Sequence, residues 1–290
     1  MGKRIPFKGY DLTRDAFGES QDFYGIDVHP LLVKDYETVH KMSLLYLNNT
    51  VDEEELFRRM SLLKYLLFVS NMSKSKLLAK TLKEILEKIF QEEVIFQFSL
   101  TKDSERMDYE EDFTILIYFN EYISEEDLFK LVGMLRFYIY LPESDKTIYE
   151  SMFQKLKDLM LFQNYLPADD FRVTSKRAYD RLEQTKASML KKYQGRDIFQ
   201  DMIMYRLITH ETLDYIENNV TWKMFKATID RFEKIIEFTT IKPLEMSGQI
   251  QYKDKKYKTD KWSDYIKPRS YYDGVLKSAD DTINKLKKLT

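Results

Sequence analysis

The side chains that most often carry out catalysis or bind metals are sparse in this sequence. It has three histidines and no cysteine, which excludes disulfides, thiolate zinc sites and cysteine nucleophiles. The histidines are His29, His40 and His210, and no two of them lie four residues apart, the spacing that places both imidazoles on one helix face. We therefore expect no zinc site and no histidine-based catalysis.

Acidic side chains occur in short runs, and paired carboxylates can bind magnesium. Glu110, Asp169 and Asp280 each begin such a run, and each run falls in a predicted loop or at the end of an element. Carboxylates at these places more often cap helices or face solvent. The sequence also contains no glycine-rich phosphate-binding motif and no GxSxG nucleophile motif. We therefore predict that the chain is not an enzyme and uses no cofactor or metal.

Charge is distributed unevenly along the chain. Residues 253–290 hold 11 Lys or Arg against 6 Asp or Glu, a net charge of +5, whereas the other residues together carry −7. A helix expected at 174–193 is also rich in Lys and Arg, but Asp180 and Glu183 lie between them. Basic segments can bind nucleic-acid phosphates, whereas alternating charges are typical of a solvated face. We prefer the solvated interpretation and keep nucleic-acid binding as an alternative.

Methionine and aromatic residues are the most distinctive part of the composition. The chain has 13 methionines, 21 tyrosines and 19 phenylalanines in 290 residues. Methionine is flexible and polarisable, so it suits apolar surfaces that accept helical partners, although a core that tolerates methionine explains the same composition. We expect Met202, Met204, Met224 and Phe225 to contribute to an apolar protein-binding surface.

The elements that position these residues are predicted to be mostly helical, because glycine and proline are few and apolar residues recur at helical spacing. β-branched and aromatic runs indicate a few strands among the helices of the first half. The elements expected there are a strand at 23–29, a helix at 31–47, an amphipathic helix between 73 and 90, a hairpin of 94–100 with 113–119, and a helix from Ser124 to about Tyr140.

The second half is predicted to be more uniformly helical. The helices expected after the first half lie at 148–162, 174–193, 198–209 and 210–218, followed by one that Thr221 caps and by a short strand at 248–257. In the capped helix, apolar residues alternate three and four positions apart, at Trp222, Phe225, Ile229, Phe232 and Ile236. This seam predicts a core face packed on the preceding helix, or a docking site for a partner helix.

These elements together predict a mainly α fold of the α+β class, with a small β-hairpin or sheet in the N-terminal half and a short C-terminal strand. We divide the chain into an extended arm at 1–22, an α+β subdomain at 23–142, a helical subdomain at 148–266 and a basic tail at 267–290. No segment reaches the roughly 18 apolar residues of a membrane span, and we expect no signal peptide. The lack of cysteine favours a reducing compartment such as a cytoplasm.

In their order and residue character, several segments resemble a group of proteins from long-tailed phages that infect Gram-positive bacteria. The segments that carry the resemblance are 24–36, 161–164, 198–205, 213–225, 246–254 and 261–264. Members of this group are described as tail assembly chaperones or tail-associated proteins. The resemblance implies a non-enzymatic helper in the host bacterial cytoplasm that binds the tape-measure protein, the tail-tube protein or both, and that could also self-associate.

Two other functions remain open from the sequence. The chain could be a permanent structural part of the virion, such as a neck or baseplate component. Alternatively, it could bind nucleic acid or inhibit a host defence, using the basic tail and the helix at 174–193. An adaptable apolar surface rich in methionine fits the chaperone interpretation best.

Overall fold

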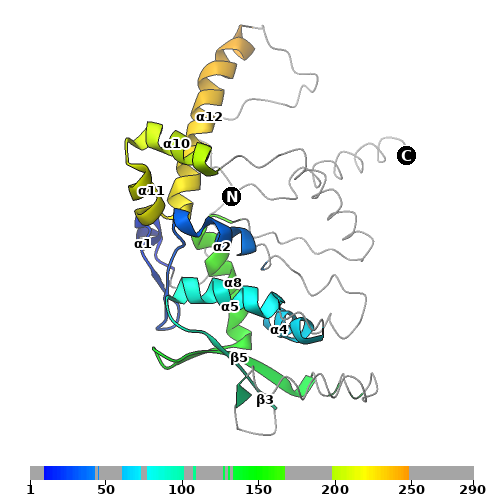
Figure 1. The fold of residues 1–290 in the computed structure, drawn as a ribbon. Coiled ribbons are helices and arrows are strands. Elements are labelled where there is room, and N and C mark those ends of the chain that lie inside the picture. Colours follow the sequence, from blue (N-terminus) through cyan, green and yellow to red (C-terminus); the bar gives the residue numbers. More distant parts are fainter. Residues whose placement is uncertain are drawn as a thin grey trace, which may run out of the picture.

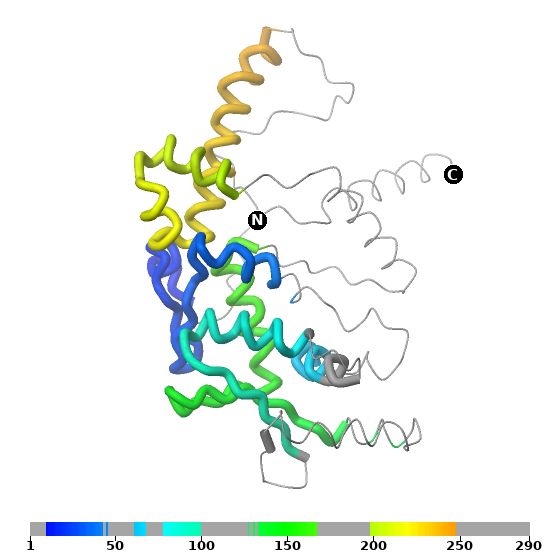
Figure 2. The backbone as a smooth tube through the Cα atoms, in the orientation of Figure 1, coloured from blue at the N-terminus to red at the C-terminus, as the bar shows by residue number. Residues whose placement is uncertain are grey.

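The computed structural model describes residues 10–42, 45, 61–72, 77–100, 107–108, 127, 130, 133–166 and 198–247. Helices predominate in these residues and two small antiparallel sheets accompany them, so the mainly α, α+β class is confirmed. The larger sheet lies at one end of the described part, helices cover it, and a second group of helices lies at the other end (Figures 1 and 2). None of the helices in the described ranges is long and apolar enough to cross a membrane.

The N-terminal elements are short and begin with a helix. In chain order they are α1 (Leu12–Phe17), β1 (Gln21–Asp22), β2 (Asp27–Val28), the 3-10 helix η1 (Val33–Asp35) and α2 (Tyr36–Lys41). The Asp11 carboxylate caps α1 by accepting hydrogen bonds from the amides of Thr13 and Arg14, and Gly18 ends the helix in a left-handed conformation. The prediction of an extended arm at 1–22 is therefore wrong for its described part, because local caps nucleate a helical turn there.

The expected strand at 23–29 and helix at 31–47 both form over shorter ranges. Within the predicted strand, only Asp27 and Val28 form strand pairing, in a small hairpin with β1. The helix begins as η1 rather than at Leu31, because Leu31 accepts a hydrogen bond from the Trp222 amide and Leu32 forms an isolated bridge with Thr221. Pairing with a distant segment therefore keeps the first residues of the predicted helix extended.

The larger sheet has four antiparallel strands. They are β3 (Ile95–Leu100), β4 (Met107–Asp108), β5 (Leu135–Leu141) and β6 (Lys146–Tyr149), in the order β4-β3-β5-β6. β3 confirms the strand expected at 94–100. The prediction of a helix to Tyr140 is wrong over β5, where buried Leu135, Phe137 and Ile139 alternate with more exposed residues. This period of two is the pattern of a strand with one buried face.

Two helices, α4 (Leu62–Met72) and α8 (Glu150–Gln163), pack against this sheet, and α8 follows β6 directly. A third helix, α5 (Leu77–Phe90), packs on α4. One main hydrophobic core gathers residues from both sides of the expected boundary, among them Leu135, Phe137 and Ile139 of β5 and Phe153, Leu156 and Leu159 of α8. The expected boundary between residues 142 and 148 is therefore wrong, because it cuts the β5–β6 hairpin and separates α8 from the core it completes.

The second group of helices comprises α10 (Ile198–Thr209), α11 (Leu213–Asn219) and α12 (Trp222–Met246), and we call it the helical layer. α10 matches its predicted range, and Thr221 caps α12 by accepting a hydrogen bond from the Met224 amide. A smaller core joins this layer to η1 and contains Val33, Tyr205, Ile216, Val220, Phe225 and Ile229. Beyond this core α12 continues past α10 and α11 (Figure 1).

Several predictions lie outside the described residues. They are the strand at 113–119, the helix at 174–193, the strand at 248–257, the basic tail at 267–290 and the three acidic runs that begin at Glu110, Asp169 and Asp280.

Candidate functional site

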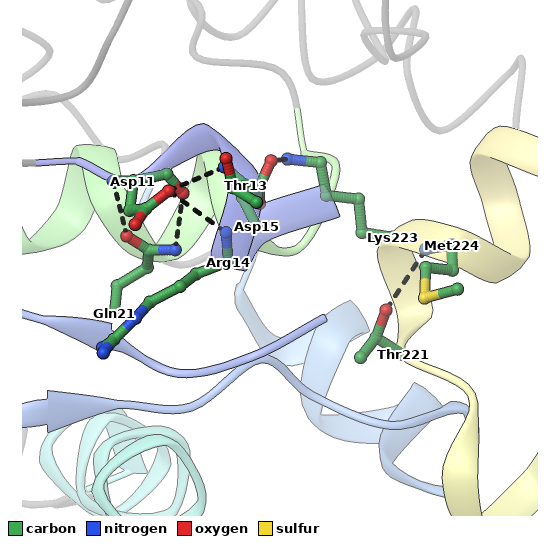
Figure 3. Close-up of polar contacts among 8 residues, drawn as sticks. All are labelled: Asp11, Thr13, Arg14, Asp15, Gln21, Thr221, Lys223 and Met224. Carbon is green, nitrogen blue, oxygen red and sulfur yellow. Dashed lines mark hydrogen bonds and ion pairs between the residues drawn. The ribbon is translucent and has the colours of Figure 1, made fainter. Parts of the chain in front are cut away.

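The junction between α1 and the start of α12 brings together residues about 200 positions apart in the sequence. The side chains of Lys223 and Asp15 point toward each other (Figure 3) and form an ion pair with a distance of 2.5 Å between the ammonium and the carboxylate. Only 20% and 10% of the two side chains are exposed. The same ammonium lies 4.2 Å from the centroid of the Phe162 ring, a cation–π contact. One lysine of α12 therefore binds both α1 and the end of α8.

A buried tyrosine stands beside this ion pair. The Tyr10 ring packs edge-on against Phe162, with the two ring centroids 5.1 Å apart. Burial, reinforced by the negative charge of Asp15, raises the pKa of the Tyr10 hydroxyl above its ordinary value. Tyr10 therefore stays neutral in the folded protein, and the junction is built from a neutral phenol and one closed ion pair.

Backbone hydrogen bonds of residues 31–33 hold the two cores together. The Asn164 side chain accepts a hydrogen bond from the Leu31 amide at 2.8 Å and donates one to the Met160 carbonyl at 2.8 Å, and all three groups are buried. On the other side, the Val33 amide donates to the Val220 carbonyl at 3.0 Å. Because each link satisfies a buried polar group, α8 and the helical layer are both fixed to one extended segment.

The four residues expected to form an apolar surface do not lie on one surface. Phe225 is fully buried in the smaller core, where its ring lies 5.4 Å from that of Tyr205. Met202 and Met204 are half-buried and pack against the same core. Met224 is 39% exposed. Phe225 therefore stabilises the helical layer from inside, and of the four only Met224 presents a large part of its side chain to solvent.

The structure reveals other exposed apolar side chains on the helical layer. Phe199, Ile203 and Leu207 of α10 are 52%, 40% and 72% exposed. On the far half of α12, large apolar side chains are exposed at Ile235, Ile236, Leu244 and Met246. In the sequence, apolar residues lie on most sides of the helix at 198–209, so their pattern does not show which side faces the core.

A second ion pair fixes the orientation of α10. Asp201 is 5% exposed and receives the Lys226 ammonium of α12 at 3.0 Å, while Tyr205 packs one turn further on. The Lys226 ammonium also lies 6.0 Å from the Trp222 ring centroid. Because Asp201 and Tyr205 both face α12, the face that carries Ile203 and Leu207 is turned away from it.

The main core contains one more charged pair. The Lys64 ammonium lies 3.8 Å from a Glu150 oxygen, and the same carboxylate accepts hydrogen bonds from the Ser61 hydroxyl at 2.5 Å and the Phe137 amide at 3.2 Å. Burial lowers the pKa of Lys64, an effect that the charge of Glu150 opposes. With its carboxylate held by three groups, Glu150 is suited to anchoring α4 at the start of α8 rather than to proton transfer.

The residues considered for metal binding lie apart. His29, His40 and His210 belong to different segments, and within the described ranges no three His, Asp or Glu side chains converge on a possible ion site. Comparison with protein-family models, with curated proteins and with solved structures found no match.

Proposed function

We propose that this chain is a non-enzymatic phage tail assembly protein that binds the tape-measure or tail-tube protein in the host cytoplasm. Two observations support the proposal. One is the resemblance of segments such as 24–36 and 198–205 to tail assembly chaperones and tail-associated proteins. The other is the apolar surface on the far half of α12.

The observation that carries the proposal is this surface. Ile235 and Ile236 are 37% and 44% exposed, and Met246 at the end of the helix is 80% exposed. They lie beyond the smaller core, which reaches along α12 only to Ile229. Exposed isoleucine and methionine on a helix anchored at its other end offer an adaptable apolar face, suited to an amphipathic helix of a partner.

The proposed mechanism requires reversible binding. A chaperone must release its client when tail-tube subunits polymerise, so the contact must be weaker than the final assembly. A few exposed, adaptable apolar side chains are enough for such a weak contact, and their flexibility keeps its specificity low. The anchored half of α12, held by Lys223 and Phe225, keeps this face in a fixed position.

Co-expression with a tape-measure fragment tests this function. We expect the fragment to become soluble and to elute with this chain as a complex in gel filtration. The variant carrying Ile235→Glu and Ile236→Glu should lose the complex, whereas Phe17→Glu, at a site 71% exposed on α1, should retain it. Failure of the wild-type chain to solubilise either a tape-measure or a tail-tube fragment would refute the proposal. Detection of this chain in purified virions would instead favour a neck or baseplate component.

A further inference from the structure

The tip of the β1–β2 hairpin is a tight turn that presents a tyrosine to solvent. Phe23 and Ile26 close the turn with two backbone hydrogen bonds of 2.8 and 3.2 Å, which leaves Tyr24 and Gly25 as its central residues. Both have a positive φ, 55° and 83°, as a type I′ turn requires. Such turns prefer asparagine, aspartate or glycine at the first central position. The turn geometry alone therefore does not account for Tyr24, which is 56% exposed.

Two lysines from other elements lie beside this turn. The Lys155 ammonium of α8 donates a hydrogen bond to the Tyr24 hydroxyl at 3.1 Å, and it lies 5.7 Å from the centroid of the tyrosine ring. The Lys146 ammonium of β6 lies 3.8 Å from the position that a Cβ on Gly25 would occupy. The turn, β6 and α8 therefore each place a hydrogen-bond donor at the tip of the hairpin.

Within the described ranges, neither of these lysines has a carboxylate partner. Lysines elsewhere in those ranges do form ion pairs, for example Lys41 with Glu84. The Tyr24 hydroxyl accepts a hydrogen bond from Lys155 and donates none to any residue that the structure describes. The tip therefore offers two cations and one hydroxyl proton for which the described part of the chain supplies no acceptor.

We propose that the hairpin tip, formed by Tyr24, Lys146 and Lys155, binds a carboxylate-rich segment of a partner protein. The Tyr24 oxygen and the Lys155 nitrogen lie 3.1 Å apart, so the two oxygens of one carboxylate can accept a hydrogen bond from both groups. Lys146, beside the next residue of the turn, adds a cation for a neighbouring carboxylate of the same segment. The site lies on other elements than the apolar face of α12 and does not rest on the tail-assembly function.

The surrounding charge favours an acidic protein segment over nucleic acid. Asp22 and Asp27 are exposed on the same hairpin, and the chain outside residues 253–290 carries a net charge of −7. Nucleic acids present a continuous row of phosphates, and proteins bind them through many cations. Two lysines on an acidic hairpin suit a few spaced carboxylates better than such a dense polyanion, because the nearby carboxylates repel every phosphate of the row.

Nuclear magnetic resonance of the isotope-labelled full chain, titrated with a blocked hexaglutamate peptide, tests this site. We expect saturable shifts of the Tyr24 and Gly25 amide signals, with a Kd on the order of 1 mM at low salt. Binding should weaken at about 0.5 M salt, because the contacts are exposed charge pairs. A residue-specific measurement is needed, since residues 253–290 carry a net charge of +5 and also attract the peptide.

Three variants separate this site from a general effect of charge. Lys155→Met should weaken peptide binding at the tip about threefold to tenfold, because one exposed ion pair is lost. Tyr24→Phe keeps the ring and the net charge, and it should weaken binding about twofold to fivefold by removing one donor. Lys34→Met removes an exposed lysine of η1, and it should leave the Kd unchanged. All three side chains are exposed, so each variant should stay folded, which its own spectrum verifies.

Two results would overturn the inference directly. One is the absence of shifts at Tyr24 and Gly25 up to about 10 mM peptide. The other is a Kd that is the same in Tyr24→Phe, Lys155→Met and Lys34→Met. Tighter binding of a thymidine hexanucleotide at the same signals would assign the tip to nucleic acid, and shifts that grow with protein concentration alone would assign it to a second copy. Either result also overturns an acidic partner segment. No tape-measure fragment is used, so these outcomes are independent of the tail-assembly function.

Discussion

The contact between the end of α1 and the start of α12 makes a sharp prediction about Gly18. This glycine has a φ of +73°, and a Cβ built on it would lie 2.7 Å from the Thr221 methyl carbon and 3.4 Å from the Met224 sulfur. Alanine at this position would therefore destabilise the fold for two reasons: its backbone would be left-handed, and its Cβ would clash with α12.

The two costs can be estimated separately. A left-handed conformation costs a residue with a Cβ about 1–2 kcal/mol. Forcing an extra carbon into a filled site costs about 1–3 kcal/mol. Gly18→Ala should therefore lower the free energy of unfolding by about 3 kcal/mol. Gly25 is a matched control, because its φ is +83° but its nearest neighbour, the Lys146 ammonium, lies 3.8 Å away. Gly25→Ala should cost only the backbone part, about 1–2 kcal/mol.

A double-mutant cycle isolates the contact. Thr221→Ser removes the methyl group that the new Cβ would meet and keeps the hydroxyl that caps Met224. Thr221→Ser should therefore restore about 1–2 kcal/mol in the Gly18→Ala background, although alone it costs about 0.8 kcal/mol for the lost buried carbon.

Urea denaturation followed by circular dichroism measures all these variants. The coupling between Gly18→Ala and Thr221→Ser should be clearly favourable, and the coupling between Gly25→Ala and Thr221→Ser should be near zero. Equal costs for the two glycine substitutions, or no coupling in the first cycle, would refute the docking of α1 on α12.

Three further predictions concern buried polar groups. Asn164→Leu should lower the free energy of unfolding by about 2–4 kcal/mol, because the buried Leu31 amide loses its acceptor, and urea denaturation measures this. In the same assay Glu150→Ala should cost about 3 kcal/mol and Lys64→Met less than about 1 kcal/mol, since burial already disfavours the ammonium; the reverse order would contradict our account of the pair. Because the pKa of Tyr10 is raised above its ordinary 10.0, its contribution to stability is complete below pH 10 and is lost as the pH rises further. Tyr10→Phe should flatten that alkaline decline, and an unchanged decline would show that Tyr10 does not cause it.

Local signals in the sequence were sufficient for several elements. Ile198–Thr209 is helical as expected, and the Thr221 hydroxyl caps α12, because a cap and a helical period act within a few residues. At β5 the same kind of local signal gave a wrong prediction. One helix was expected from Ser124 to about Tyr140, yet the alternation from Leu135 to Leu141 belongs to a strand.

The candidate site was less predictable than the fold, because exposure depends on what packs against each helix. α10 is apolar on most sides, so the sequence alone could not tell that Tyr205 faces the core while Ile203 and Leu207 face solvent. The aromatic seam of α12 is likewise buried at Phe225 and Ile229 but exposed at Ile236. The apolar surface was predicted from methionine content, yet Phe225 is buried and Met202 and Met204 are half-buried.

The sequence by itself determined the helical character of the chain, the cap of α12 and the lack of thiol chemistry, since these depend on residue type and short-range spacing. Only the tertiary structure decided that Asn164 meets Leu31 and that Lys223 meets Asp15. Contacts over more than 100 residues arise when apolar faces are buried together, and the buried polar groups must then find partners within that packing. The packing of α10 on α12 likewise decided which apolar side chains of α10 remain exposed.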